Sequence, residues 1–114
     1  MDKSRKKEIA RAWRERERSQ GVFAVRCAAS GEAWVAATRN LDSAQNAVWF
    51  ALRQGGHPNR ALAAAWAAHG EAAFAYEVLE AVDQGELTDA GLGDLLKQRE
   101  RHWRETLGAA KLAG

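Results

Sequence analysis

The chain has 114 residues, of which 46% are hydrophobic, and its formal net charge is +2. This length suits one domain with a modest core, and the single cysteine, Cys27, excludes an internal disulfide. No apolar run approaches the ~20 residues of a membrane span, and the N-terminus lacks the apolar stretch of a secretory signal. We therefore expect a cytoplasmic protein with no membrane partner and with Cys27 as a buried thiol.

Basic side chains gather near the start of the chain. Residues 1–18 carry eight Lys or Arg against four acids, whereas residues 21–96 carry four against nine. Nucleic-acid binding requires Lys or Arg where the phosphate backbone runs. The distribution therefore favours contacts through the first segment, with Lys6, Lys7 and Arg11 as candidates, or else a solvated helix face there.

Residues 4–18 predict a helix, because Ser4 can cap it and strong helix formers follow. Ile9, Ala12 and Trp13 fall on one narrow apolar face. The remaining faces carry solvated charge, so this helix needs docking to be stable.

The next segments predict a hairpin and two helices. Residues 22–27 and 33–36 are short β-rich runs joined by a Ser-Gly turn, which is typical of an antiparallel hairpin. A helix then begins at Asn40 or Asp42 and ends at about Gln54, before two glycines. A second helix covers residues 60–69.

Residues 74–80 alternate between apolar and polar side chains and predict a third strand. A last helix begins after Thr88 or Asp89 and extends to Leu107. The order α-ββ-αα-β-α predicts an α+β fold, with a small antiparallel three-stranded sheet flanked by helices. We expect a basic helix at 1–19, a domain at 20–109 and a tail at 110–114.

Two triplets and one longer pattern carry a resemblance. The triplets are Gly-Val-Phe at residues 21–23 and Trp-Val-Ala at 34–36. The longer pattern, with its order and spacing intact, comprises His57, Asn59, Leu62, Trp66, Gly70, Phe74 and Val78-Leu79-Glu80. Together they resemble the GIY-YIG nuclease superfamily, and the first helix resembles the basic leader of small bacterial members.

The resemblance implies phosphodiester cleavage by tyrosine-assisted attack, an arginine on the helix after the hairpin, and a glutamate that holds Mg²⁺ or Mn²⁺. Such a hard cation takes carboxylate oxygens. Glu100, three residues before Trp103, matches the position of that catalytic, metal-binding glutamate. The alternative interpretation is a solvated acid between Arg99 and Arg101.

The other catalytic positions of the resembled family are altered here. Phe23 and Trp34 replace the two tyrosines and keep an aromatic ring without the hydroxyl. The arginine falls on Ala44 in the usual register, or on Ala47 with the spacing of the small bacterial members. Neither residue is basic, although Arg39 could substitute from the loop before the helix.

Several further residues have two interpretations. His57 and Asn59 could contact nucleic acid, or could cap the helices on either side of their loop. Trp66 is more simply a core anchor than a platform for base stacking. Trp49 falls off the apolar stripe of its helix, so we expect it to be partly exposed near the cleft.

These observations predict a GIY-YIG-type protein with weak or no cleavage and a residual nucleic-acid-binding role, through the first helix and the face at residues 97–104. A second hypothesis is an active, divalent-metal-dependent DNA endonuclease that recruits Arg39, His57 or Tyr76. A third is a non-catalytic module that binds another protein.

Overall fold

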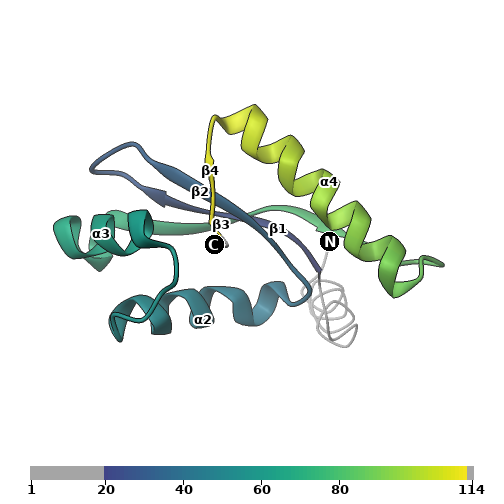
Figure 1. Cartoon of the computed structure of the whole chain (residues 1–114), viewed down its shortest axis with the longest axis horizontal. Coiled ribbons are helices and arrows are strands. Elements are labelled where there is room, and N and C mark those ends of the chain that lie inside the picture. Colours follow the sequence, from purple (N-terminus) through teal and green to yellow (C-terminus); the bar gives the residue numbers. More distant parts are fainter. Residues whose placement is uncertain (1–19, 113–114) are drawn as a thin grey trace, which may run out of the picture.

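The structure, a computed structural model, describes residues 20–112 (Figure 1). The helix predicted over residues 4–18, with Lys6, Lys7 and Arg11, lies outside the described residues. The α+β class and the order of the remaining elements are confirmed. The elements are β1 (Gln20–Cys27), β2 (Ala33–Thr38), α2 (Leu41–Arg53), α3 (Arg60–His69), the short 3₁₀ helix η1 (Glu71–Ala73), β3 (Phe74–Val82), α4 (Asp89–Leu107) and β4 (Ala110–Lys111).

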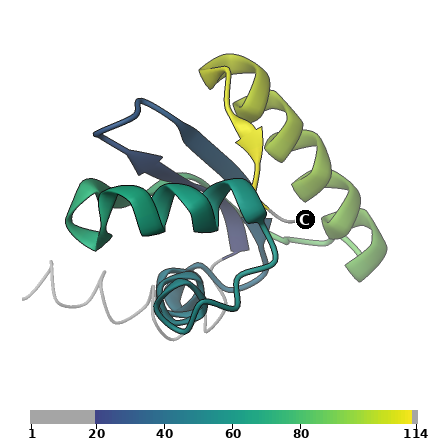
Figure 2. The ribbon, with the colours of Figure 1, turned by 60° about the vertical axis from the view of Figure 1, so that its left-hand side comes forward.

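The sheet has four strands in the order β3-β1-β2-β4, one more than the three predicted. β1 pairs antiparallel with β2 and β3, whereas β4 pairs parallel with β2. β4 descends from the end of α4 onto the sheet (Figure 2), so Ala110 and Lys111, assigned to a tail from the sequence, belong to the sheet. A strand of two residues shows no periodicity that the sequence could reveal.

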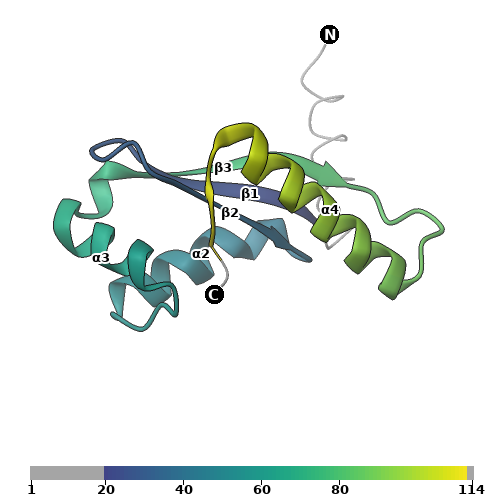
Figure 3. The ribbon, with the colours of Figure 1, turned by 45° about the horizontal axis from the view of Figure 1, so that its top comes forward.

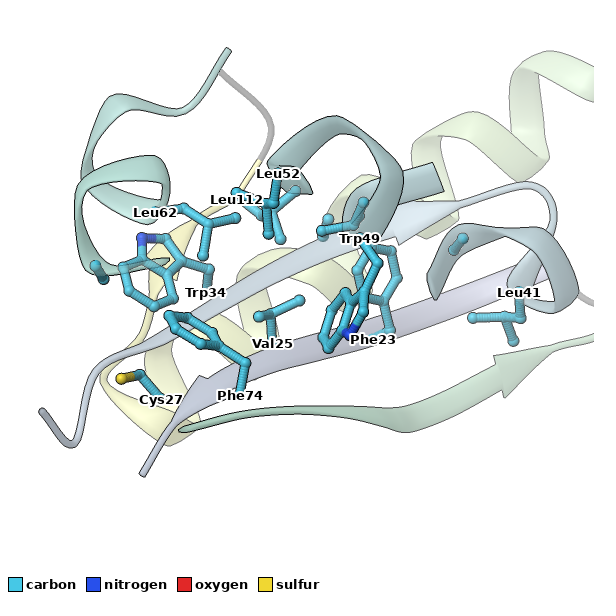
Figure 4. Close-up of a cluster of buried hydrophobic side chains, with 14 residues drawn as sticks. Phe23, Val25, Cys27, Trp34, Leu41, Trp49, Leu52, Leu62, Phe74 and Leu112 are labelled. Carbon is cyan, nitrogen blue, oxygen red and sulfur yellow. The ribbon is translucent and has the colours of Figure 1, made fainter. Parts of the chain in front are cut away.

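Helices cover both faces of the sheet. α2 and α3 lie on one face, and α4 packs on β1 and β2 from the other (Figures 1 and 3). The larger core fills the α2–α3 face (Figure 4), and its sheet residues include Phe23, Val25, Cys27, Trp34 and Phe74. On the α4 face, Val22, Ala24 and Val35 are buried beneath Trp103 and Leu107.

A β-bulge links the edge strand β3 to β1. Phe23 pairs with Val78 and Val22 pairs with Glu80, so Leu79 is an extra residue in β3. The bulge turns two successive side chains, Leu79 and Glu80, toward α4. The strands approach so closely that a Cβ on Gly21 would lie 2.0 Å from the Glu80 carbonyl oxygen. The first residue of the Gly-Val-Phe triplet therefore has to be glycine for a structural reason.

Side-chain caps define where the helices begin. Asn40 Oδ1 accepts a hydrogen bond from Ser43 N at 3.2 Å, and Thr88 Oγ1 accepts one from Gly91 N at 3.0 Å. Such caps satisfy backbone N–H groups that the helix leaves free. These two caps fix the starts of α2 and α4, the helices that cover opposite faces of the sheet. No helix within residues 20–112 is long and apolar enough to cross a membrane.

Trp49 corrects one expectation from the sequence. Its side chain is buried, with 7% exposure, rather than partly exposed. Trp66 meets its ring edge-on at a centroid distance of 5.6 Å, and Tyr76 does so at 6.5 Å. The helical stripe missed this residue because Trp66 on α3 and Tyr76 on β3 cover its ring, and both lie far from α2 in the sequence.

Candidate functional site

The two positions that match the family's tyrosines lie in the core. Phe23 on β1 is 3% exposed and Trp34 on β2 is 2% exposed. Phe23 packs on Tyr76 with ring centroids 5.1 Å apart, and Trp34 stacks on Phe74 at 6.4 Å (Figure 4). Both side chains therefore serve as packing groups beneath α2 and α3, without a hydroxyl and without access to solvent.

The two positions that match the family's arginine differ in their surroundings. Ala44 is 7% exposed and packs in the core beneath α2, whereas Ala47 is exposed on the same helix. The nearest basic residue on α2 is Arg53 in its last turn, which donates two hydrogen bonds to the Glu71 carboxylate at 2.9 and 2.7 Å. The surface of α2 therefore presents no free cation beside Phe23 or Trp34.

Glu100 lies on α4, on the opposite side of the sheet from Phe23 and Trp34. Its Oε2 lies 3.2 Å from Arg104 Nε, and its side chain is only 12% exposed. A divalent cation requires several oxygen ligands, but the partner of this carboxylate is a guanidinium. Within residues 20–112, no three His, Cys, Asp or Glu side chains come together as metal ligands would. The residues around Glu100 therefore do not fit a divalent metal.

The loop before α3 uses both of its candidate residues for its own structure. His57 Nδ1 accepts a hydrogen bond from Asn59 N at 3.0 Å, and burial lowers the His57 pKa. Asn59 Oδ1 caps α3 through Leu62 N at 3.0 Å. Its Nδ2 donates to the carbonyls of Lys111 and Leu112 at 3.0 and 2.9 Å. Asn59 thus ties the end of the described chain to α3.

Tyr76 and Arg39 are held at separate places. The Tyr76 hydroxyl donates to the Leu41 carbonyl at 3.1 Å, and burial together with the charge of Asp42 raises the Tyr76 pKa. Arg39 donates from a terminal guanidinium nitrogen to the Asp89 carbonyl at 3.1 Å, at the start of α4. These residues and His57 do not gather around Glu100, as an alternative catalytic centre would require.

A polar network that the sequence did not reveal joins β3 to α4. Glu80 Oε1 accepts hydrogen bonds from Arg99 Nε at 2.8 Å and Trp103 Nε1 at 2.9 Å. Burial opposes ionisation of Glu80, but these hydrogen bonds and the charge of Arg99 outweigh it and lower its pKa. In the sequence, the only sign of this network is that Arg99 and Trp103 are one helical turn apart and therefore share a side of α4.

Basic side chains line one side of α4. The Arg39 guanidinium lies 3.3 Å from the point that a Cβ on Gly93 would occupy. Lys97 and Arg101 follow Gly93 one and two turns later, and both are exposed. We call Arg39, Lys97 and Arg101 the α4 basic row. The α4 positions 93, 97 and 101 rise about 6 Å per step along the helix.

Comparison with solved structures identifies the same fold in a nuclease domain. The catalytic domain of homing endonuclease I-TevI matches with a TM-score of 0.68 and 19% identity, over 83% of this chain and 99% of that chain. A mutant of the catalytic domain of intron endonuclease I-TevI matches with a TM-score of 0.66 and 18% identity, over 79% of this chain and 84% of that chain. The predicted resemblance to the GIY-YIG superfamily is thereby confirmed at the level of the fold. No family model and no curated protein matches the sequence.

Proposed function

We propose that this chain is a GIY-YIG-fold domain that does not cleave phosphodiesters and that binds nucleic acid through the α4 basic row. The observation that carries the first part is the burial of Phe23 and Trp34 at 3% and 2% exposure. Cleavage needs a group that removes a proton from the attacking oxygen and a positive charge on the phosphate. Here the aromatic pair can supply neither.

The residues around Glu100 support the same proposal. Its carboxylate is paired with Arg104 on the next turn of α4. The sheet separates it from Phe23, so the two positions cannot act together on one phosphate without rearrangement of the core. We therefore assign no Mg²⁺ or Mn²⁺ to the function of this domain.

The α4 basic row supports the binding part. Its members are exposed, and within residues 20–112 none of them pairs with a carboxylate. Arg39 donates only to the Asp89 carbonyl within these residues. A line of cations along one helix suits the regularly spaced charges of a phosphate backbone. Few cations are involved, so binding is weak and strongly salt-dependent.

A salt titration with matched charge reversals tests the binding. Fluorescein-labelled single- and double-stranded DNA and RNA are titrated with the full chain and with Lys97→Glu and Arg101→Glu. Arg60→Glu is the control, because Arg60 is an exposed cation on α3, across the sheet. Each α4 variant should lower the slope of log affinity against log salt by about 0.7–0.9, whereas the control leaves it unchanged.

Equal effects of the three variants would indicate a loss of general charge and would overturn the assignment to α4. Binding that does not change with salt would contradict a phosphate contact altogether and would favour a protein-interaction module.

A further inference from the structure

The α2–α3 face of the sheet has an uncovered apolar corner at the end of β3. Val78 pairs with Phe23 and therefore shares its face, but its side chain is 47% exposed. Ala81 pairs with Gly21 on the same face and is also exposed. Nearer the middle of the strand, Tyr76 is partly covered by α2. We call Val78 and Ala81 the β3 corner.

The outer edge of β3 is unpaired in the described part of the chain. The strand has nine residues and pairs only with β1. A long edge of free backbone N–H and C=O groups invites pairing with other chains, and proteins usually cover such an edge. The corner and the edge therefore offer one continuous surface that a further element could cover.

The N-terminal segment enters the sheet next to this corner. Gln20 pairs with Val82, and its Nε2 donates to the Val82 carbonyl at 2.9 Å. Trp13 precedes Gln20 by seven residues, which is about 10 Å along a helix. Val78 precedes Val82 by four residues, which is about 13 Å along a strand. The apolar face of the predicted helix can therefore reach the corner without a long linker.

Charge favours the same occupant. Residues 1–18 carry eight Lys or Arg against four acids, whereas the rest of the chain has nine against eleven. Asp83 directly follows the strand, and the charge of Asp42 acts on the nearby Tyr76 hydroxyl. A basic amphipathic helix over the corner would therefore place its cations near acidic groups at the rim.

We propose that residues 4–18 pack as a helix on the β3 corner, with Ile9 and Trp13 against Val78 and Ala81, and cover the free edge of β3. The occupant is thus a segment of the same chain. This docking supplies the apolar burial that a helix with such a narrow apolar face requires.

Cross-linking of the full chain tests the placement. In a Cys27→Ala background, one protein carries Trp13→Cys with Val78→Cys, and the control carries Trp13→Cys with Phe50→Cys. Phe50 is suitable because it is even more exposed, at 64%, on α2. A short bismaleimide at low protein concentration should join the first pair within one chain at least tenfold more efficiently than the second.

Equal yields for the two pairs would overturn the proposal, as would no internal product from the first pair. Cross-linked dimers from the 13–78 pair would assign the corner to a second copy and would equally overturn it.

Hydrogen exchange provides a second measurement in the full chain. Val78→Asp should accelerate exchange of the outward-facing amides of β3 about tenfold or more, because the helix no longer covers them. Phe50→Asp should leave them unchanged. Amides of β1 report global stability and should remain protected in both variants. Unchanged β3 exchange in Val78→Asp would contradict a docked helix.

Discussion

Different interactions hold the helices on the two faces of the sheet. On the α2–α3 face, aromatic rings pack against one another, with Phe23 on Tyr76 and Trp34 on Phe74. On the α4 face, the apolar patch is smaller, and a charged network around Glu80 fastens the helix to the edge strand. The positions that would carry catalysis in the resembled family fall on both faces. On one face, Phe23 and Trp34 belong to the core, and on the other face Glu100 forms an ion pair with Arg104.

If this domain does not cleave phosphodiesters, as we propose, the two faces explain how the fold can be kept without that chemistry. Replacing tyrosine by phenylalanine or tryptophan keeps the ring that the core needs and removes the hydroxyl that catalysis needs. A buried hydroxyl without a partner costs free energy, so the apolar rings suit a face that is sealed by two helices. The α4 face is partly open to solvent, so it can keep charged side chains.

Among these tests, an arginine placed on the packed side of α2 should change stability most. Ala44→Arg should destabilise the fold by about 4 kcal/mol, because an unpaired guanidinium would enter the core. Ala47→Arg, one turn later on the exposed side, should change the free energy of unfolding by less than about 0.5 kcal/mol. Urea denaturation measures both. Equal effects would contradict the assignment of Ala44 to the core and Ala47 to solvent.

A second test addresses the close approach of β1 to the edge strand β3 at Gly21. Gly21→Ala should cost about 3 kcal/mol, because its Cβ would collide with the Glu80 carbonyl oxygen and force β1 from β3. Gly56→Ala is the matched control, since nothing lies within 4 Å of its Cβ position. Thermal unfolding of the two variants should differ clearly. A Gly21→Ala variant as stable as Gly56→Ala would show that the strands are less closely spaced.

A smaller effect tests the sealing of the aromatic face. Phe23→Tyr adds only a hydroxyl, and burial without a partner should cost about 1–3 kcal/mol. The same variant should not produce cleavage, because the new hydroxyl remains covered. Chemical denaturation gives the cost. A neutral or stabilising result would indicate that the ring reaches solvent or finds an acceptor, and the aromatic face would then be less closed than described.

The smallest effect belongs to the network on the α4 face. Glu80→Gln should cost about 1 kcal/mol at pH 7. The folded pKa of Glu80 is lowered, so its stabilisation is full above the unfolded pKa of about 4.3 and is lost as the pH falls through the folded value. The difference between wild type and variant should therefore shrink in acid. Glu77→Gln is the control, because its pair with Arg26 is about half exposed and contributes little. A difference that persists at low pH would exclude Glu80 ionisation as its source.

Much of the fold follows from the sequence. The third strand was predicted at residues 74–80 and observed at Phe74–Val82, and α3 matches its predicted bounds of 60–69. These segments have clear alternation, caps or glycine stops. β4 and the bulge at Leu79 could not be predicted, because both arise from pairing between distant strands. Trp49 was placed wrongly for a related reason, since α3 and β3 enclose it.

Less of the candidate site could be predicted. The sequence already shows that Phe23 and Trp34 carry no hydroxyl, but the burial of both rings depends on the packing of α2 and α3. The partners of Glu80 depend on how α4 is oriented on the sheet. The partner of Glu100, in contrast, is Arg104, four residues later on the same helix. Arg39 illustrates the same limit: it lies near Gly93, one helical turn before Lys97, although 58 positions separate Arg39 from Lys97 in the sequence. Sequence spacing alone could therefore not predict that Arg39 joins the α4 basic row.

The most direct test of the central claim is single-turnover cleavage. Excess full-length protein is incubated with branched, single-stranded and double-stranded DNA in Mg²⁺ or Mn²⁺, beside Glu100→Ala and Glu100→Gln. We predict that the wild type gives no more nicked product than either variant with any substrate. Nicking by the wild type that both Glu100 variants abolish would contradict it and would show that this fold has kept its chemistry.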